Sequence, residues 1–206
     1  MITEKGTAKK VSLGSFTNVR RSGLIAIKLK KDDILKWVRP TTGKNEIVLV
    51  SSKGQAIRFK EKDLRSMGRN ATGVRGIRLK KDDLVVGMGV IYQRENKDKN
   101  TKLLIITEKG FGKMTFLSNY RLQGRGGSGV NTAKITDKNG KIIGVRIIDE
   151  KSLPDYIKGD LLIISRLGQT IRLPLKSVPV MGRSTQGVHL MRFKKEDDQV
   201  SSLTLI

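Results

Sequence analysis

Residues 106–110 read Ile-Thr-Glu-Lys-Gly, and residues 2–6 read the same five letters. A second repeated stretch, Leu-Lys-Lys-Asp-Asp, occupies residues 29–33 and 79–83. Extended along the chain, these anchors align a first glycine (Gly6, Gly54, Gly110, Gly168) and a second glycine (Gly23, Gly73, Gly129, Gly187). Self-similarity at a fixed period is typical of arrays of similar modules. The sequence therefore predicts four modules, at residues 1–46, 47–100, 101–158 and 159–206.

Each module is predicted to consist of short β-strands. An apolar run such as Leu103–Ile106 precedes the first glycine, and a strand such as Gln55–Phe59 follows it. After the second glycine, positions alternate apolar, basic, apolar, as in 77–79, which is the period of a strand with one buried face. A last strand such as Leu84–Val90 closes the module. This pattern predicts an all-β radial fold of four-stranded blades, with no helix longer than about two turns.

The composition excludes several classes of protein. Lys and Arg number 42 against 19 Asp and Glu, a net charge of +23, while 37% hydrophobic residues suffice for a packed core. The absence of a long uncharged apolar run argues against a membrane-spanning helix. The chain has no cysteine and one histidine, His189, which argues against disulfides, zinc-thiolate sites and a Ser-His-Asp triad. We expect a soluble cytoplasmic protein, without a metal site, whose partner is a polyanion.

One glycine-rich loop carries an arginine in each of the last three modules. The arginine stands four residues before the second glycine, at Arg69, Arg125 and Arg183, and the first module offers Arg20 and Arg21. Equivalent loops of a radial repeat lie on one rim, where arginines and free backbone N–H groups can contact phosphates. The alternative is that each arginine only caps carbonyl groups or solvates a turn.

Further basic residues follow the first glycine, at Lys9, Lys10, Arg58, Lys113 and Arg172. A curved row of such charges can follow a bent duplex without reading its bases. Proteins that bind single-stranded nucleic acid or RNA usually stack the bases on exposed aromatic side chains. Aromatic residues make up only 4% of the chain, and Phe59, Phe111 and Phe193 fall at strand positions expected in the core.

Three other motifs have simpler explanations than chemistry. Gly124, Gly126 and Gly129 fit a dinucleotide-binding pattern, but no apolar strand precedes them and no helix is predicted after them. The aspartate pairs 32–33, 82–83 and 197–198 are expected in exposed turns. Tyr120 precedes Arg121, the order seen where a tyrosine attacks DNA, but two residues carry little information.

Long stretches of the chain resemble one known family, the C-terminal domain of the DNA gyrase A protein. The resemblance rests on Lys53–Glu61, on Arg65–Leu79, and on three shorter stretches at Phe16–Ile27, Glu108–Lys113 and Val180–Val188. It covers essentially the whole chain. It implies a β-pinwheel, in which radial blades exchange strands with their neighbours, and duplex DNA wrapped around a basic rim.

The resemblance also implies partners and a place in a larger enzyme. In that family the domain presents wrapped DNA to the breakage-reunion domain of the gyrase A protein. Passage of one DNA segment through the other, powered by ATP on the gyrase B protein, then yields negative supercoils. No cofactor is expected in this chain, since ATP and Mg²⁺ belong to the other parts, and no catalytic residue is expected either. The chain alone should bind and bend DNA in the bacterial nucleoid, contact no membrane, and not supercoil. Arg121 joins the residues expected to bind DNA.

Two departures from the family pattern stand out. Members normally have six blades, and these four modules resemble the last four; Met1 aligns with Ile105, inside a strand, so we expect a longer parent chain. The family's box, Q-(R/K)-R-G-G-(R/K)-G, belongs to the first blade. Here a degenerate copy in the third module matches it at Gln123, Arg125, Gly126, Gly127 and Gly129.

The sequence is compatible with three alternatives. The equivalent C-terminal domain of topoisomerase IV has the same blades, often fewer, with a lost box. A basic RNA-binding β-repeat protein is the second. A protein-interaction propeller is the third, although its rim would rarely need a charge of +23.

Overall fold

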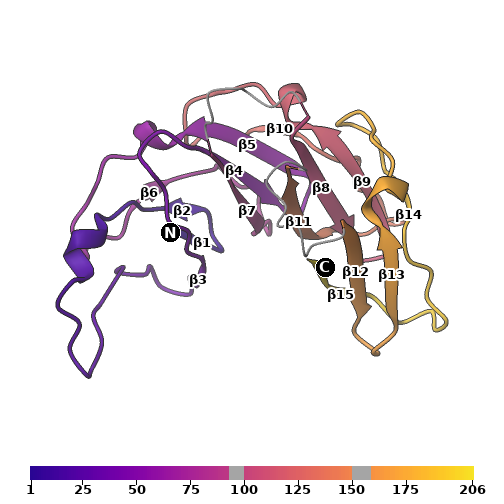
Figure 1. Cartoon of the computed structure of the whole chain (residues 1–206), viewed down its shortest axis with the longest axis horizontal. Helices are drawn as coiled ribbons and strands as arrows, with labels where there is room; N and C mark the ends of the chain where they lie inside the picture. The colour runs from indigo at the N-terminus through magenta and orange to yellow at the C-terminus, as the bar shows by residue number, and fades with distance from the viewer. Residues whose placement is uncertain (93–99, 150–158) are drawn as a thin grey trace.

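The computed structural model describes residues 1–92, 100–149 and 159–206. These residues form four antiparallel sheets arranged one after another along an arc (Figure 1). The predicted surface loop at residues 93–100 lies, except for its last residue, outside the described part of the chain. Within that part the only helices are four short 3₁₀ turns, η1 (Leu13–Phe16), η2 (Glu61–Asp63), η3 (Leu117–Asn119) and η4 (Leu175–Ser177). No helix there is long and apolar enough to span a membrane. The expected all-β fold is confirmed.

Three of the sheets have four strands. The first, in the order β3-β1-β2-β6, contains β1 (Ile2–Thr3), β2 (Thr7–Ala8), β3 (Leu35–Trp37) and β6 (Val74–Arg75). The second, β10-β5-β4-β7, contains β4 (Glu46–Ser51), β5 (Gln55–Lys60), β7 (Val85–Ile91) and β10 (Val130–Asn131). The third, β11-β8-β9-β14, contains β8 (Lys102–Thr107), β9 (Phe111–Phe116), β11 (Ile142–Ile148) and β14 (Val188–His189).

The fourth sheet has three strands, in the order β13-β12-β15. They are β12 (Asp160–Ser165), β13 (Thr170–Pro174) and β15 (Val200–Leu205). In every other sheet the outer strand is covered by a fourth strand. The fourth sheet thus consists only of the three strands that every module contributes to its own blade.

The fourth strand of each complete sheet comes from the following module. Arg75 of β6 pairs with Thr7, Asn131 of β10 with Gln55, and His189 of β14 with Phe111. In all three cases the exchanged strand is the pair of residues directly after the second glycine. The strand exchange that the resemblance implied is therefore confirmed.

The segment after the second glycine is shorter as a strand than the alternation predicted. Ile77 is buried and Arg78 exposed, as expected, but only Val74 and Arg75 belong to a strand. The backbone N–H groups of Gly76 and Ile77 both donate to the Gly6 carbonyl, at 2.8 and 3.4 Å, so the chain bends there. In the first module this segment forms no strand, and Leu29 is 43% exposed.

The hydrophobic core lies between successive sheets, in three clusters. Phe59 and Phe111 are buried and Phe193 packs against the last cluster, which confirms the core positions expected for them. On the inner side of the arc, β7 approaches β11 closely. A Cβ atom on Gly87 or Gly89 would lie 2.5 Å from Val145 or 2.3 Å from Ile147, so these glycines permit the curvature.

The aspartate pairs are turn residues, but only the first member of each pair is exposed. Asp32 and Asp82 have φ of 57° and 54°, in the left-handed region that aspartate tolerates in turns. The second member is buried, against expectation. Asp83, for example, accepts hydrogen bonds from the N–H of Lys53, the N–H of Leu84 and the hydroxyl of Ser52. The second aspartate ties the turn to the neighbouring hairpin.

Candidate nucleic-acid interface

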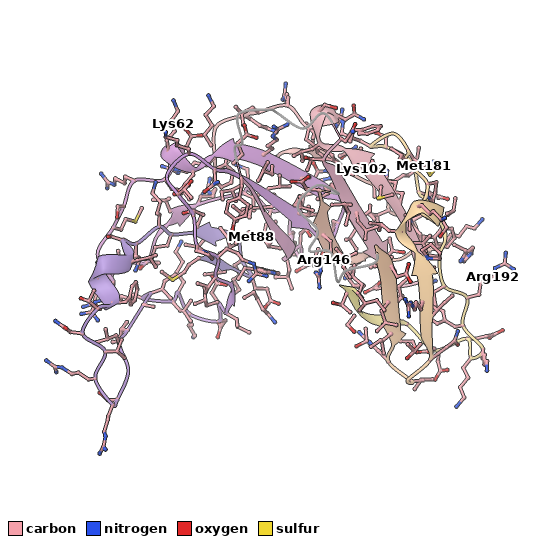
Figure 2. All side chains as sticks on the ribbon, in the orientation of Figure 1. Lys62, Met88, Lys102, Arg146, Met181 and Arg192 are labelled. Carbon is pink, nitrogen blue, oxygen red and sulfur yellow. The ribbon has the colours of Figure 1, made fainter. Side chains whose placement is uncertain are left out.

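Three equivalent loops on the outer side of the arc carry the arginines singled out in the sequence. Each loop begins with a backbone N–H that donates to a backbone carbonyl of the preceding module, four residues after its first glycine: Met67 to Lys10, Gln123 to Arg58 and Met181 to Met114, at 2.8–2.9 Å. Because one contact recurs at three junctions, the loops occupy matching places along the arc. Figure 2 shows Lys62 of η2 and Met181 on the convex side, with Met88 and Arg146 on the concave side.

The second glycine allows each loop to lie directly on the preceding blade. At Gly129, φ is +76°, and a Cβ would fall 2.3 Å from the Ala56 carbonyl oxygen. Gly73 and Gly187 have φ of +101° and +85°, with carbonyl oxygens 2.6 and 2.7 Å from the same position. Only glycine adopts this conformation at such a close approach without strain. These three glycines thus allow the loops to pack against the preceding blades.

Two of the three loop arginines, Arg125 and Arg183, donate hydrogen bonds to backbone carbonyl groups. Arg125 donates from Nε to the Asp63 carbonyl at 2.9 Å and from Nη1 to the Arg75 carbonyl at 3.3 Å. Arg183 donates from Nη1 to the Asn131 carbonyl at 3.1 Å, the equivalent position one module later. These bonds are the carbonyl caps of the alternative interpretation. Each uses part of a guanidinium that carries five N–H donors.

Lys9 and Lys113 do not lie on the rim where they were expected to contact DNA. Both side chains are fully buried. Each ammonium group instead donates to backbone carbonyl groups: Lys9 to Ala26 of its own module and Arg69 of the next, and Lys113 to Gly182 and Arg183 of the next module. We therefore remove these two lysines from the set of candidate contacts. Sequence alone missed their burial because lysine is rarely an interior residue.

The other basic residues after the first glycine are mostly paired within the protein. Arg58 forms an ion pair of 2.6 Å with Glu46 and donates to the carbonyls of Leu117 and Tyr120. Arg172 pairs with Asp160 at 2.6 Å, in a more exposed position. Lys10 lies 3.8 Å from Glu61. Part of this row is thus neutralised, and it contributes less to the surface charge than the sequence suggested.

The remaining candidates are exposed. Arg20, Arg21 and Arg121 have solvent-accessible side chains. A second aligned set, five residues after each second glycine, is also exposed on all four modules: Lys28, Arg78, Lys134 and Arg192. Arg192 projects from the outer edge of the fourth blade in Figure 2. This set belongs with the loop arginines as a source of positive charge at the junctions.

The segment with the degenerate box folds as an ordinary junction loop. The Gly126 N–H donates to the Gly76 carbonyl at 2.7 Å, and the Gly127 carbonyl accepts from the Arg78 N–H at 2.8 Å. The half-buried Gln123 starts the loop. A two-residue strand, and not a helix, follows Gly129, which excludes the dinucleotide-binding interpretation.

Tyr120 is a core residue. Its ring is buried, and its hydroxyl shares a hydrogen bond with Thr132 of the segment that follows the loop. Burial raises the pKa of the Tyr120 hydroxyl above its ordinary value. A buried, protonated phenol cannot reach a DNA phosphate, so Tyr120 is not a candidate nucleophile for DNA cleavage.

Comparison with known proteins gives one consistent family. A family model described as DNA gyrase C-terminal domain, beta-propeller, matches residues 1–42, 45–91, 101–149 and 159–206. The DNA gyrase A protein of Ureaplasma parvum serovar 3 is 39% identical over 196 residues, 95% of this chain and 22% of that protein. The DNA gyrase A protein of Staphylococcus aureus strain MRSA252 is 38% identical over 200 residues, 97% of this chain and 21% of that protein. The chain thus spans about a fifth of these relatives.

Two solved structures share the fold. The crystal structure of the C-terminal domain of DNA topoisomerase IV matches all of this chain and 60% of that chain, with a TM-score of 0.86 and 24% identity. A structure of the DNA gyrase A C-terminal domain matches 99% of this chain and 64% of that chain, with a TM-score of 0.81 and 23% identity. Each of the four family matches contains three strands of one sheet, and the last three matches also contain the strand that is exchanged into the preceding sheet.

Proposed function

We propose that this chain, which belongs to the DNA gyrase C-terminal domain, beta-propeller family, binds duplex DNA without reading its sequence and bends it around the outer side of the arc. One observation carries the proposal: three consecutive junctions present an arginine loop at the same place, in a chain of net charge +23. Cations repeated at equivalent junctions along an arc suit a polymer with evenly repeated phosphates.

The chemistry of binding is electrostatic. A duplex has a phosphate charge about every 1.7 Å along its axis, and each contact with Arg or Lys releases condensed counterions. The backbone N–H groups of a glycine-rich loop can contribute hydrogen bonds to phosphate oxygens. No long helix among the described residues could enter a major groove, and buried aromatic rings leave few platforms for stacking bases. The preferred ligand is therefore a duplex bent along the arc.

We propose further that the chain serves a gyrase in the bacterial cytoplasm. Its relatives are parts of DNA gyrase, a topoisomerase. In this proposal the bent duplex is passed to the breakage-reunion domain of the gyrase A protein, while the gyrase B protein supplies ATP hydrolysis with Mg²⁺. The chain itself carries out no catalysis and needs no cofactor. The fold shared with topoisomerase IV supports a second candidate, the equivalent domain of that enzyme.

A binding experiment tests the proposal. Fluorescence anisotropy with two duplexes of equal length and unrelated sequence should give the same affinity, and single-stranded DNA and RNA should compete weakly. If about six phosphates are neutralised, log K should fall against log salt with a slope near −5. A slope near zero, or strong preference for one sequence or for RNA, would overturn the proposal.

A topology assay distinguishes the two enzymes. Nicked circular DNA is incubated with the chain and sealed with ligase, and the linking number is then measured. Constrained positive writhe supports gyrase-type wrapping. DNA that is bound but leaves the linking number unchanged favours the topoisomerase IV candidate.

A further inference from the structure

Lys113 is a charged residue held entirely inside the protein. It lies on β9 of the third sheet, and its side chain has no solvent exposure. Its Nζ atom donates to the carbonyls of Gly182 and Arg183, both at 2.6 Å, and to Oγ1 of Thr185 at 3.0 Å. An ammonium group has three N–H donors, and here three acceptors meet it. All three acceptors belong to the arginine loop of the next module.

Lys9 repeats this arrangement two modules earlier. Both lysines stand three residues after a first glycine, Gly6 or Gly110, and both are buried. Lys9 Nζ donates to the Ala26 carbonyl at 2.8 Å and to the carbonyl of Arg69. In both blades, therefore, a buried ammonium group binds the backbone of the loop arginine that the next module supplies.

The junction between them shows what replaces the lysine. There the equivalent residue is Ile57, whose Cδ1 lies 3.7 Å from where a Cβ on Gly127 would be. The loop over Ile57 has the sequence Gly-Arg-Gly-Gly-Ser-Gly at residues 124–129 and packs on an apolar side chain. The lysine thus accompanies the two loops with fewer glycines, Gly-Arg-Asn-Ala-Thr-Gly and Gly-Arg-Ser-Thr-Gln-Gly.

Burying an ammonium group is unfavourable unless its donors are satisfied. Burial, reinforced by the nearby charge of Arg183, lowers the pKa of Lys113 to about 8. Three hydrogen bonds to one loop offset that penalty and fix the orientation of the Gly182 and Arg183 carbonyls. The direction of a carbonyl group is coupled to the adjacent backbone dihedral angles. By holding these two carbonyls, the ammonium group therefore also fixes the direction of the Cα–Cβ bond of Arg183.

We propose that Lys113 is a positioning residue for DNA binding: it cannot reach the duplex and acts by holding the loop that presents Arg183. Lys9 has the same role for Arg69. The inference rests on the proposed function, because it concerns how the DNA-binding loops are held. It explains why a buried lysine occupies, in two of the four modules, the position that Ile57 and Ile171 occupy in the other two.

A double-mutant cycle tests the role of Lys113. Duplex affinity is measured for the wild type, Lys113→Met, Arg183→Ala and the double variant, in one low-salt buffer and well below each melting temperature. We expect Lys113→Met to lower affinity several-fold, and the double variant to bind as Arg183→Ala does, because the lysine acts through the arginine. The control is Lys109→Met, which removes one exposed charge from the β8–β9 hairpin and should change affinity by less than about two-fold.

Two other results of the cycle would overturn the inference. Independent, multiplying losses would show that Lys113 acts on DNA directly, and a lower melting temperature with unchanged affinity would make it a purely structural residue; either result overturns the inference. If the wild type does not bind duplex DNA at all, the proposed function fails and the inference fails with it. Should Lys113→Met not fold, Thr185→Val and the Lys9→Met/Arg69→Ala cycle answer the same question, since each probes the same type of contact.

Discussion

Replacing the loop arginines tests whether they bind DNA or only cap carbonyls. The variants are Arg69→Ala, Arg125→Ala, Arg183→Ala and the triple variant. If each arginine neutralises one phosphate, each loss reduces the salt slope by about 0.9 and lowers affinity about 8-fold at about 0.1 M salt. Because the three loops are separate, the losses should multiply, to about 500-fold in the triple variant.

The structure gives a different stability effect for each arginine. Arg125 donates two hydrogen bonds to carbonyls and Arg183 donates one, all at exposed positions. Exposed contacts of this kind contribute about 0–1 kcal/mol each. Arg69 makes no side-chain hydrogen bond to any residue that the structure describes, so Arg69→Ala should leave the melting temperature nearly unchanged. Arg69 is therefore the cleanest test of DNA binding separate from stability.

Anisotropy titrations at several salt concentrations, with thermal melts followed by circular dichroism, measure both quantities. Lys109→Ala serves as the charge-matched control, since its hairpin lies at the opposite ends of β8 and β9 from η3. Lower melting temperatures for Arg125→Ala and Arg183→Ala with unchanged affinity and salt slope would refute the reasoning. The arginines would then be capping residues, and DNA would follow another face.

Two further changes test the junction geometry and the buried lysine. Gly129→Ala should lower the melting temperature by more than about 4 °C, because its new Cβ atom would clash with the Ala56 carbonyl. Gly23 has the same φ of +76° with no atom within 4 Å, so Gly23→Ala should lower the free energy of unfolding by only about 1 kcal/mol. Equal destabilisation of the two variants would show that the positive φ alone, and not the clash with Ala56, sets the cost. The pKa of Lys113 is lower in the folded than in the unfolded protein, so the unfolded state binds more protons between about pH 8 and 10. The wild type should therefore gain stability relative to Lys113→Met as pH rises through this window in denaturant titrations, and a constant difference would contradict the lowered pKa.

The sequence predicted the fold because the repeat shows each constraint several times. Gly73, Gly129 and Gly187 recur with the same spacing because each lies against a carbonyl of the preceding blade. Alternation after these glycines predicted that Ile77 is buried and Arg78 exposed. It overestimated the length of the strand, because the hydrogen bonds to Gly6 that end the strand come from another module.

The site was harder to predict, because charge in a sequence does not show which side of a strand it occupies. Lys9, Lys113 and Arg58 were grouped with exposed residues, yet their partners are carbonyls and a carboxylate distant in sequence. A usable signal exists in the alignment. Lys9 and Lys113 share the position of the apolar residues Ile57 and Ile171, and an interior position occupied by lysine indicates an internal ammonium group with fixed acceptors.

Carbonyl capping and phosphate binding are compatible in the same arginine. The Arg183 guanidinium uses Nη1 for the Asn131 carbonyl and has five N–H donors in a rigid plane. Fixing one edge of the plane removes side-chain freedom before DNA arrives, so less entropy is lost when the remaining donors meet a phosphate. A lysine at this position would keep the positive charge, but it could not contact the Asn131 carbonyl with one edge of a planar group and a phosphate with the other. Arg183→Lys should therefore preserve most of the salt slope while lowering affinity about three-fold, and an affinity equal to that of the wild type would show that DNA responds to the charge alone.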